Sequence, residues 1–396
     1  MPDPLCLIVS NNFPPSIGGA GTVYAALARA GGGRVHVLCA ARDYRTGSDL
    51  PGIAVHDAAC GFPVDRIAEI RPPVGRTGRW RELGIRGRLL LRVWRLWRRH
   101  RFAVLIIADD ESVGWLMAPA QRLLGLRVVL YSHGDDLGAE TARLRARRAR
   151  QFERADAVVA ISDAAARALT GTYGLPRDRI TLVPNGVDTA LFRPMPPDLT
   201  LIEAYGLTGR HVILTVTRLV PRKGVDRLLE ALAILLRDMP DLHYLIVGDG
   251  PQLAELRARA AQPDIAGHVS FAGAIDAADV PRHMALGEIM VMPNRRMPDG
   301  EDDGASLVFL EANACGKPVV GGIAGGAGEL ITHGANGLLV DGTAPADIAA
   351  AIRAILNDPA LSARLAAGGR LAAEDAAWPR RAKGFLDLCA RLAGPG

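Results

Sequence analysis

An acidic segment followed by a short apolar helix contains residue types that could bind a phosphorylated sugar. Asp303 lies in the acidic run, Ser306 stands where a helix N-cap is expected, and Glu311 follows within the helix expected over 307–314. The N-terminus of that helix would offer unpaired N–H groups and a partial positive charge, which suit a phosphate. Carboxylates on either side could accept hydrogen bonds from sugar hydroxyls. An ordinary βα unit with surface acids explains the same pattern equally well.

Two cations follow the first strand expected in the second half of the chain. Arg218 and Lys223 lie in TRLVPRKG, residues 217–224, on a loop that opens a helix. Two positive groups that converge at a helix start could clamp a diphosphate. Their place at a strand end favours this interpretation over a pair of solvated cations.

A glycine loop and a histidine follow strands in the first half of the chain. Gly18, Gly19 and Gly21 in FPPSIGGAG would allow close approach to a phosphate or sugar, although Tyr24 occupies the third glycine position of a dinucleotide-binding motif. His133 is expected at the carboxyl end of a strand, where ligand clefts form, and imidazole suits hydrogen bonding near neutral pH. A packing turn and a structural histidine remain the alternatives.

Three further turns are weaker signals. The segments 248–251 and 271–274 end expected strands and would place Gly273 at a sheet edge. Asp135 and Asp136 resemble a metal-ligand pair, but two acids in a turn are usually solvated, so no metal site is expected.

The sequence RGRLLLRVWRLWRRHRF, residues 86–102, has an amphipathic helical pattern. The expected apolar face contains Leu89, Leu90, Val93, Trp94 and Trp97. Tryptophan, leucine and arginine in this arrangement suit a helix that lies at a membrane surface. A helix that packs on its own sheet, with the arginines in solvent, is the alternative.

Short apolar runs alternate with helical patterns along the chain, which is typical of parallel sheets covered on both faces. The strands expected in the first half are 5–9, 35–38, 53–56, 103–107, 128–131, 157–161 and 180–183. Those expected in the second half are 212–216, 244–247, 269–272, 289–292, 319–320 and 337–340. The proline-rich stretch 192–200 indicates a linker. We therefore predict two α/β domains, at 1–193 and 194–378, with a last helix over 379–396 that packs back on the first.

Composition narrows the class of protein. Of 396 residues, 49% are hydrophobic and 22% are charged, as expected of a globular protein with a core. Five scattered cysteines without a CxxC pair indicate neither a disulfide framework nor a zinc site. The absence of a signal-peptide pattern and of a long apolar run leads us to expect a cytoplasmic protein. Twelve arginines and two acids in residues 66–101 favour one basic surface over general affinity for nucleic acid.

Together, these motifs resemble those of the retaining glycosyltransferases of family 4, which have the GT-B fold. The resemblance covers nearly the whole chain, and the order and spacing of the motifs are more specific than any one of them. The matching segments are FPPxxGG at 13–19, HGDD at 133–136, VPNGVDTALFRP at 183–194, RLVPRKGVDRLLEAL at 218–232, VGDGP at 247–251, EANACGKPVV at 311–320, GGAGE at 325–329 and NGLLV at 336–340.

The resemblance implies an α/β protein with two Rossmann-like domains whose parallel sheets face a central cleft. It implies transfer of a hexose from a nucleoside-diphosphate sugar to an acceptor hydroxyl, with retention of anomeric configuration and without cofactor or metal. In the family pattern Arg218 and Lys223 hold the diphosphate, and His133 lies near the reacting sugar. The donor-binding positions are Gly18, Gly19, Gly273, Asp303, Ser306, Leu307, Val308 and Glu311. Of these, Glu311 would bind the ribose hydroxyls.

Two departures from the family pattern and several open choices remain. Asp303 stands where many members have glutamate, so the side chain that would meet the donor-sugar hydroxyls is one methylene shorter, and Gly328 replaces a common proline. The acceptor is expected to be a lipid, a lipid-linked glycan or a polysaccharide precursor, with possible contact between residues 86–102 and the inner face of the cytoplasmic membrane. A sugar-nucleotide epimerase of the same fold and a non-catalytic nucleotide-sugar-binding protein are the alternatives.

Overall fold

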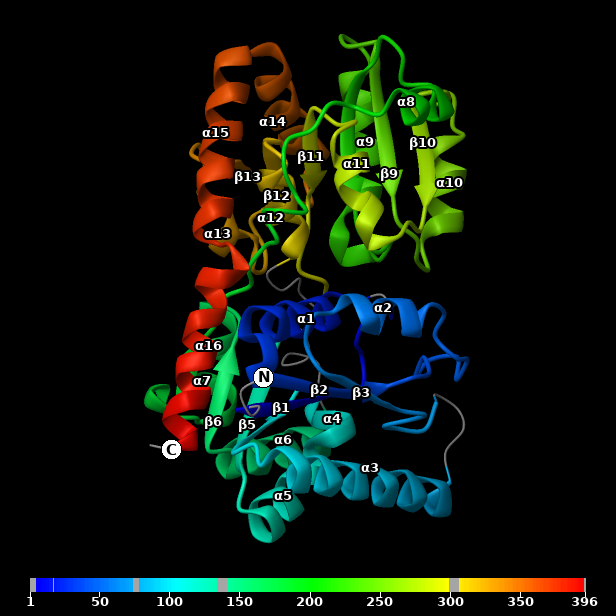
Figure 1. Ribbon diagram of the computed structural model, residues 1–396. Helices are drawn as coiled ribbons and strands as arrows, with labels where there is room; N and C mark the ends of the chain where they lie inside the picture. The colour runs from blue at the N-terminus through cyan, green and yellow to red at the C-terminus, as the bar shows by residue number, and fades with distance from the viewer. Residues whose placement is uncertain (1–4, 17, 74–77, 134–140, 299–305, 395–396) are drawn as a thin grey trace. The chain divides into compact units, whose positions relative to one another are not determined.

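The computed structural model describes residues 5–16, 18–73, 78–133, 141–298 and 306–394. The chain divides into two α/β units (Figure 1). Unit 1 comprises Met1–Asn185 and Trp378–Gly396, and unit 2 comprises Gly186–Ala377. The first boundary therefore lies several residues before position 193, where the proline-rich stretch placed it. Val187 and Phe192 explain the difference, because both side chains are buried in a core cluster of unit 2.

Within the described residues, unit 1 contains a seven-stranded parallel sheet of order β3-β2-β1-β4-β5-β6-β7. Its strands are β1 (Cys6–Ser10), β2 (Val35–Ala40), β3 (Val64–Ile67), β4 (Val104–Ile107), β5 (Arg127–Ser132), β6 (Ala157–Ala160) and β7 (Ile180–Leu182). The strand order reverses at β1, where Ile8 lies between Val37 of β2 and Ile106 of β4. The central strands are almost entirely apolar and buried, as a parallel sheet covered on both faces requires.

Helices cover both faces of the unit 1 sheet. They are α1 (Gly19–Gly31), α2 (Ile53–Ala59), α3 (Arg79–His100), α4 (Asp110–Val113), α5 (Met117–Leu124), α6 (Ala142–Arg154), α7 (Asp163–Tyr173) and α16 (Trp378–Ala393). Figure 1 shows α1 and α2 on one face and α3 and α5 on the other. On the second face, Leu89 of α3, Met117 of α5 and Phe152 of α6 share one core cluster. On the first, α16 packs against α1, and Phe385 contacts Tyr131 of β5.

Unit 2 repeats this plan in the part of the chain that the structure describes, with a six-stranded parallel sheet of order β10-β9-β8-β11-β12-β13. Its strands are β8 (His211–Val216), β9 (Leu242–Val247), β10 (Val269–Gly273), β11 (Ile289–Met292), β12 (Val319–Gly322) and β13 (Leu338–Val340). Its helices are α8 (Leu199–Tyr205), α9 (Val225–Leu235), α10 (Leu253–Ala260), α11 (Val280–Met284), α12 (Leu307–Ala314), α13 (Ala327–Leu330), α14 (Pro345–Asn357) and α15 (Pro359–Asp375). Ile213 of β8 lies between Tyr244 of β9 and Ile289 of β11, where the strand order reverses.

The expected strand at 53–56 is wrong, since these residues begin α2. Its apolar run faces outward, and Val55 is 78% exposed. The true edge strand is β3, which sequence patterning missed because Asp65 and Arg66 interrupt its apolar character. Both charges have partners: Asp65 pairs with Arg92 of α3, and Arg66 pairs with Asp57 of α2.

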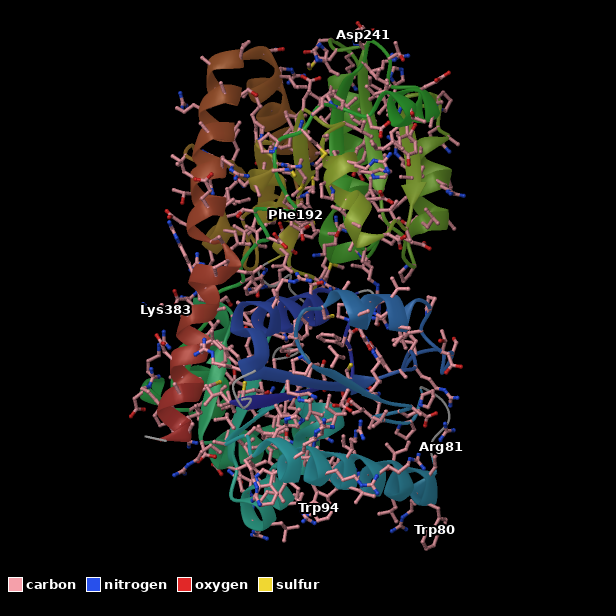
Figure 2. All side chains as sticks on the ribbon, viewed as in Figure 1. Trp80, Arg81, Trp94, Phe192, Asp241 and Lys383 are labelled. Atoms are coloured by element: carbon pink, nitrogen blue, oxygen red, sulfur yellow. The ribbon has the colours of Figure 1, made fainter. Side chains whose placement is uncertain are left out.

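The single apolar face expected in residues 86–102 is also wrong in detail. The side of α3 that packs on the sheet contains Ile85, Leu89, Val93 and Leu96. Trp94, which was assigned to that face, is exposed, and Figure 2 shows it with Trp80 on the side of α3 away from the sheet. Among the described residues, no helix has both the length and the apolar character needed to cross a bilayer.

Candidate active site

Unit 1 has a polar cavity at the carboxyl ends of its central strands. In open parallel sheets, ligands bind where the strand order reverses, which here is between β1 and β4. A cavity of about 470 Å³ lies at this point, and its lining includes Asn12 after β1, Asp109 after β4 and His133 after β5. The expected position of His133 at a strand end is therefore confirmed, while its role stays a prediction.

His133 is held by Tyr24 of α1. The Tyr24 hydroxyl lies 2.7 Å from the carbonyl oxygen of Ala108 and 2.6 Å from Nε2 of His133. A hydroxyl has one proton and a carbonyl can only accept, so Tyr24 donates to Ala108 and His133 donates from Nε2 to Tyr24. Burial lowers the pKa of His133 to about 4, which keeps the imidazole neutral at pH 7. Its Nδ1 is then suited to accept a hydrogen bond from a sugar hydroxyl.

The glycine loop precedes and opens α1. A Cβ atom on Gly18 would lie 2.5 Å from Nδ2 of Asn12, and one on Gly21 would lie 3.1 Å from the Asn12 carbonyl oxygen. These two glycines therefore let the loop pack on the end of β1. A Cβ atom on Gly19 would meet nothing within 4 Å, and Gly19 lines the cavity. Packing on backbone atoms thus accounts for Gly21, whereas the Asn12 side chain could move away from a Cβ at position 18, and Gly19 is the position with room for a ligand.

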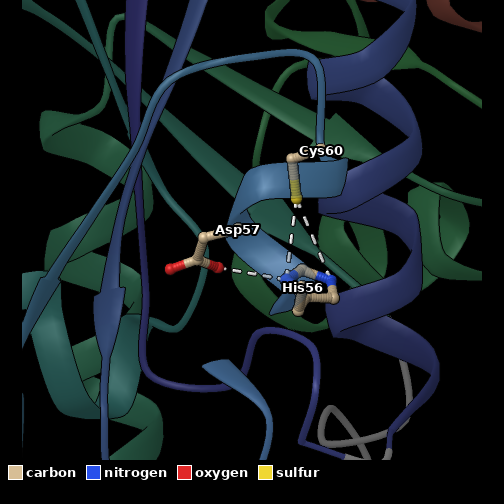
Figure 3. Close-up of side chains that lie close together, drawn as sticks. All are labelled: His56, Asp57 and Cys60. Atoms are coloured by element: carbon tan, nitrogen blue, oxygen red, sulfur yellow. Dashed lines mark hydrogen bonds and ion pairs between the residues drawn. The ribbon is translucent and has the colours of Figure 1, made fainter. Parts of the chain in front are cut away.

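A group of side chains of metal-binding types lies at the end of α2. Nδ1 of His56 is 3.0 Å from Oδ1 of Asp57 and 3.6 Å from Sγ of Cys60 (Figure 3). The Asp57 carboxylate is already neutralised, because Arg66 donates to both of its oxygens at 2.8 and 2.7 Å. Arg66 also donates to the carbonyl oxygen of Pro14, in the loop before α1. These contacts favour a structural role that fastens the glycine loop, and the expectation of no metal remains untested.

Arg218 lies directly after β8, beside the reversal of strand order in unit 2. Its side chain is exposed and forms no ion pair with any described residue. Two backbone hydrogen bonds of 2.9 Å hold its loop, from Thr217 to Val247 and from Leu219 to Asp249. The structure therefore presents this guanidinium to solvent from a fixed backbone.

Two glycines that looked like ordinary turn residues make this arrangement possible. A Cβ atom on Gly248, whose φ is +136°, would lie 1.8 Å from the Thr217 carbonyl oxygen. One on Gly250 would lie 2.4 Å from the carbonyl oxygen of Leu219. Both contacts are with backbone atoms of the Arg218 loop, so any larger residue would displace that loop.

The structure brings Lys223 and Ser306 together. Nζ of Lys223 donates to Oγ of Ser306 at 2.7 Å, and Lys223 is only 9% exposed. Ser306 is the N-cap residue of α12, as expected, but its side chain makes no capping hydrogen bond. The first N–H groups of α12, at Leu307 and Val308, therefore receive no capping hydrogen bond from Ser306 and lie beside an ammonium group. Such an arrangement suits a phosphate oxygen.

Glu311 lies on α12 and is half-buried. Burial raises its pKa to about 7, because a carboxylate loses hydration there. No described residue donates a hydrogen bond to its side chain. A ligand with hydroxyl groups could supply the missing donors.

The structure says less about the other positions expected to bind the donor. Gly273 ends β10 with a φ of +73°, a conformation that favours glycine, and its carbonyl oxygen accepts from the N–H of Gly248. Asp303, with the rest of 299–305, lies outside the described residues, and so do Asp135 and Asp136.

Sequence reasoning missed three residues of the unit 1 cavity. Tyr24, which positions His133, was noted only for interrupting a glycine motif. Tyr44 and Arg71 line the same cavity, and the Arg71 guanidinium lies 5.3 Å from the centre of the Tyr44 ring. No local motif marks either residue, because the fold alone brings them beside β1 and β4.

Comparison with known proteins decides the family. Residues 17–191 match the model of Glycosyltransferase Family 4, and residues 200–372 match that of Glycosyl transferases group 1. A GDP-mannose-dependent alpha-(1-6)-phosphatidylinositol monomannoside mannosyltransferase of Mycolicibacterium smegmatis is 38% identical over 275 residues, covering 68% of this chain and 71% of that protein. The enzyme of the same description from Mycobacterium tuberculosis strain H37Rv is 33% identical over 371 residues, covering 92% of each. The chain belongs to glycosyltransferase family 4.

Solved structures agree on the fold of this glycosyltransferase. HepE of Anabaena, crystallised in complex with UDP, aligns with a TM-score of 0.78 at 21% identity, covering 97% of this chain and 98% of that one. A glycosyltransferase from Rickettsia africae aligns with a TM-score of 0.79 at 15% identity, covering 99% of each chain. The predicted two-domain GT-B fold is thus confirmed for this family 4 glycosyltransferase.

Proposed function

We propose that this glycosyltransferase moves a mannosyl group from GDP-mannose to a hydroxyl of a glycolipid, with retention of configuration and without a metal. The observation that carries the proposal is the anion-binding group of unit 2. There Lys223 donates to Ser306, whose side chain does not cap α12, and no described residue donates a hydrogen bond to the Glu311 carboxylate on the same helix. A diphosphate with a hydroxyl-bearing ribose matches these two features.

The cations of unit 2 suit a leaving diphosphate. As the bond between the anomeric carbon and the phosphate oxygen breaks, negative charge grows on the diphosphate. Arg218, Lys223 and the first N–H groups of α12 would stabilise that charge. The acceptor oxygen then bonds to the anomeric carbon on the same face, and its proton passes to the departing phosphate oxygen. His133 is a poor candidate for the base, since a pKa of about 4 makes its imidazole weakly basic.

The cavity of unit 1 suits a polyhydroxylated acceptor that carries a phosphate. Its amide and carboxylate groups can bind hydroxyls. Arg71 in the same cavity donates to the Ser112 hydroxyl at 3.3 Å and pairs with no described carboxylate. Its positive charge therefore remains available for a lipid phosphate.

The choice of donor and acceptor is supported by the relatives. The mycobacterial enzymes are described as GDP-mannose-dependent and as acting on a phosphatidylinositol monomannoside. A lipid acceptor would bring the enzyme to a membrane, and we propose that the region of residues 86–102 makes a peripheral contact there.

Donor binding can be tested by thermal unfolding with GDP-mannose, UDP-glucose or ADP-glucose at equal concentration. A ligand that binds only the folded protein stabilises it by about 2.7 kcal/mol at a hundred times its dissociation constant. We expect GDP-mannose to raise Tm by several degrees and the other two to have smaller effects. The Lys223→Ala variant should lose most of this rise in Tm. The control variant Lys383→Ala, which changes an exposed lysine of α16, should keep it. A larger shift with UDP-glucose would refute the assignment of the base, and no shift with any donor would refute the site.

A further inference from the structure

The helix α3 has a second apolar stripe in addition to its buried one. Ile85, Leu89, Val93 and Leu96 form the side that packs on the sheet. The second stripe contains Trp80, Leu83, Gly87, Leu91 and Trp94. At 3.6 residues per turn, its centre lies roughly 165° around the helix from the buried side. The helix therefore has more apolar surface than its own sheet can cover.

This second stripe is exposed along its length. The exposed fraction is 87% for Trp80, 58% for Leu83, 44% for Leu91 and 38% for Trp94. Leu123 at the end of α5 is 69% exposed and continues the surface. Single exposed leucines are common, but such a run on adjacent helices marks a binding surface.

A shallow apolar groove runs through the same surface. It encloses about 390 Å³, and its lining is Gly87, Leu90, Leu91, Trp94, Trp97, Leu123 and Leu124. Its walls come from α3 and α5, and leucine and tryptophan side chains make up most of its lining. Figure 2 shows Trp80 and Trp94 projecting from this side of α3, away from the sheet. Aliphatic chains fit such a groove better than polar ligands do.

Arginines occupy the third side of α3. Arg88, Arg95 and Arg99 are exposed and form no ion pair with any described residue. Some arginines of the helix are engaged: Arg81 pairs with Glu69, and Arg92 pairs with Asp65. Three uncompensated cations thus lie beside the apolar stripe, with their guanidinium groups in solvent.

We propose that the outer side of α3, together with Leu123 of α5, docks on a bilayer that contains anionic phospholipid. The tryptophan and leucine side chains enter the boundary between headgroups and acyl chains, and the arginines bind lipid phosphates. The charges on α3 favour a lipid bilayer over a protein partner. The centre of a protein interface is poor in charged residues, whereas an anionic lipid surface matches this density of cations. The docking serves the lipid acceptor of the proposed function, but it requires neither donor nor acceptor.

Vesicle co-sedimentation in the absence of substrates tests the proposal. The wild type should bind vesicles of phosphatidylcholine with phosphatidylglycerol and bind phosphatidylcholine alone much more weakly. The variant Leu91→Ser/Trp94→Ser/Leu123→Ser should bind at least about tenfold more weakly, since it loses buried apolar surface. Arg88→Glu/Arg95→Glu/Arg99→Glu should lose the preference for anionic vesicles. The control is Leu199→Ser/Leu371→Ser, which changes two exposed leucines of unit 2 and should bind as wild type does.

Tryptophan fluorescence adds a readout of depth. Lipids brominated on their acyl chains should quench the wild type, and Trp80→Phe/Trp94→Phe should remove most of the quenching. Equal unfolding temperatures of all variants would show that they are folded. Equal vesicle binding by the apolar variant and its control, or no wild-type binding to anionic vesicles, would overturn the proposal. So would a wild-type dimer without vesicles that the apolar variant converts to monomer, because the surface would then join two copies of the chain.

The outcomes separate this proposal from the proposed function. A docking surface predicts that the apolar variant keeps the donor-induced thermal shift of the wild type. Loss of vesicle binding with normal donor binding supports docking by itself. Loss of both would show that the variant has disturbed the fold of the enzyme and would contradict docking as an independent property of α3.

Discussion

Replacing Arg218 or Lys223 with alanine is expected to lower kcat on the order of 10²–10³-fold, the usual loss when one stabilising group is removed from a developing charge. Arg218 should affect kcat more than donor affinity, because its exposed guanidinium has no partner among the described residues and gains one as the diphosphate leaves. Lys223 should affect both, since its contact with Ser306 also fixes the N-terminus of α12. Steady-state kinetics with saturating acceptor and varied donor would measure the effects of each variant on kcat and on the KM for the donor separately.

Two matched controls belong to this prediction. Arg237 is an exposed arginine just after α9, and Lys383 is an exposed lysine of α16. Alanine at either position should leave kcat within about twofold, as surface changes of this kind usually do. Near-normal turnover in both Arg218→Ala and Lys223→Ala would contradict the diphosphate assignment.

Donor affinity is expected to fall as the pH drops below about 7, because hydroxyl groups donate to the ionised form of Glu311 and burial raises the pKa of Glu311 to about 7. In Glu311→Gln the affinity should be roughly tenfold lower at high pH and almost independent of pH. Calorimetric titration with a nucleotide-sugar is suitable, since its diphosphate does not titrate in this range. An unchanged pH profile in the variant would exclude Glu311 as the group responsible.

The stability of the free enzyme should change in the opposite direction. Glu311 has a pKa of about 4.5 in the unfolded chain and of about 7 in the folded protein. An acid of this kind lowers the stability of the folded protein as the pH rises between these two values. Glu311→Gln should therefore raise Tm at pH values above about 7, with a gain that vanishes toward about 4.5. Ionisation of Glu311 would thus destabilise the free protein but allow it to bind the ligand. The burial of this side chain would therefore serve binding and not folding.

The positions of several candidate residues could be predicted because they depend on local signals. Arg218 and His133 each follow an apolar run that forms a strand, and ligands bind at the carboxyl ends of the strands in open parallel sheets. The helix after Ser306 was expected from an N-cap residue and an apolar run, and α12 begins at Leu307. Each of these inferences needs only the residues next to one another in the chain.

Other features depend on contacts between distant segments, which the sequence pattern does not carry. The hydroxyl of Ser306 bonds to Lys223, 83 residues away, and so is not used as a cap. Tyr24 orients His133 across 109 residues. Gly248 is required by the backbone of Thr217, which follows the neighbouring strand β8. In α3 the pattern gave an amphipathic helix but could not say which of its two apolar stripes meets the sheet.

Proton NMR of the first product formed tests the central claim most directly. The wild type would be incubated with GDP-mannose and a short-chain phosphatidylinositol monomannoside, and the anomeric signals followed before any slow rearrangement. We predict release of GDP together with a new α-linked mannosyl group, the same configuration as in the donor, and far less of either product in Lys223→Ala over the same time. An isomerised nucleotide-sugar formed without acceptor, or a β-linked product, would contradict the account.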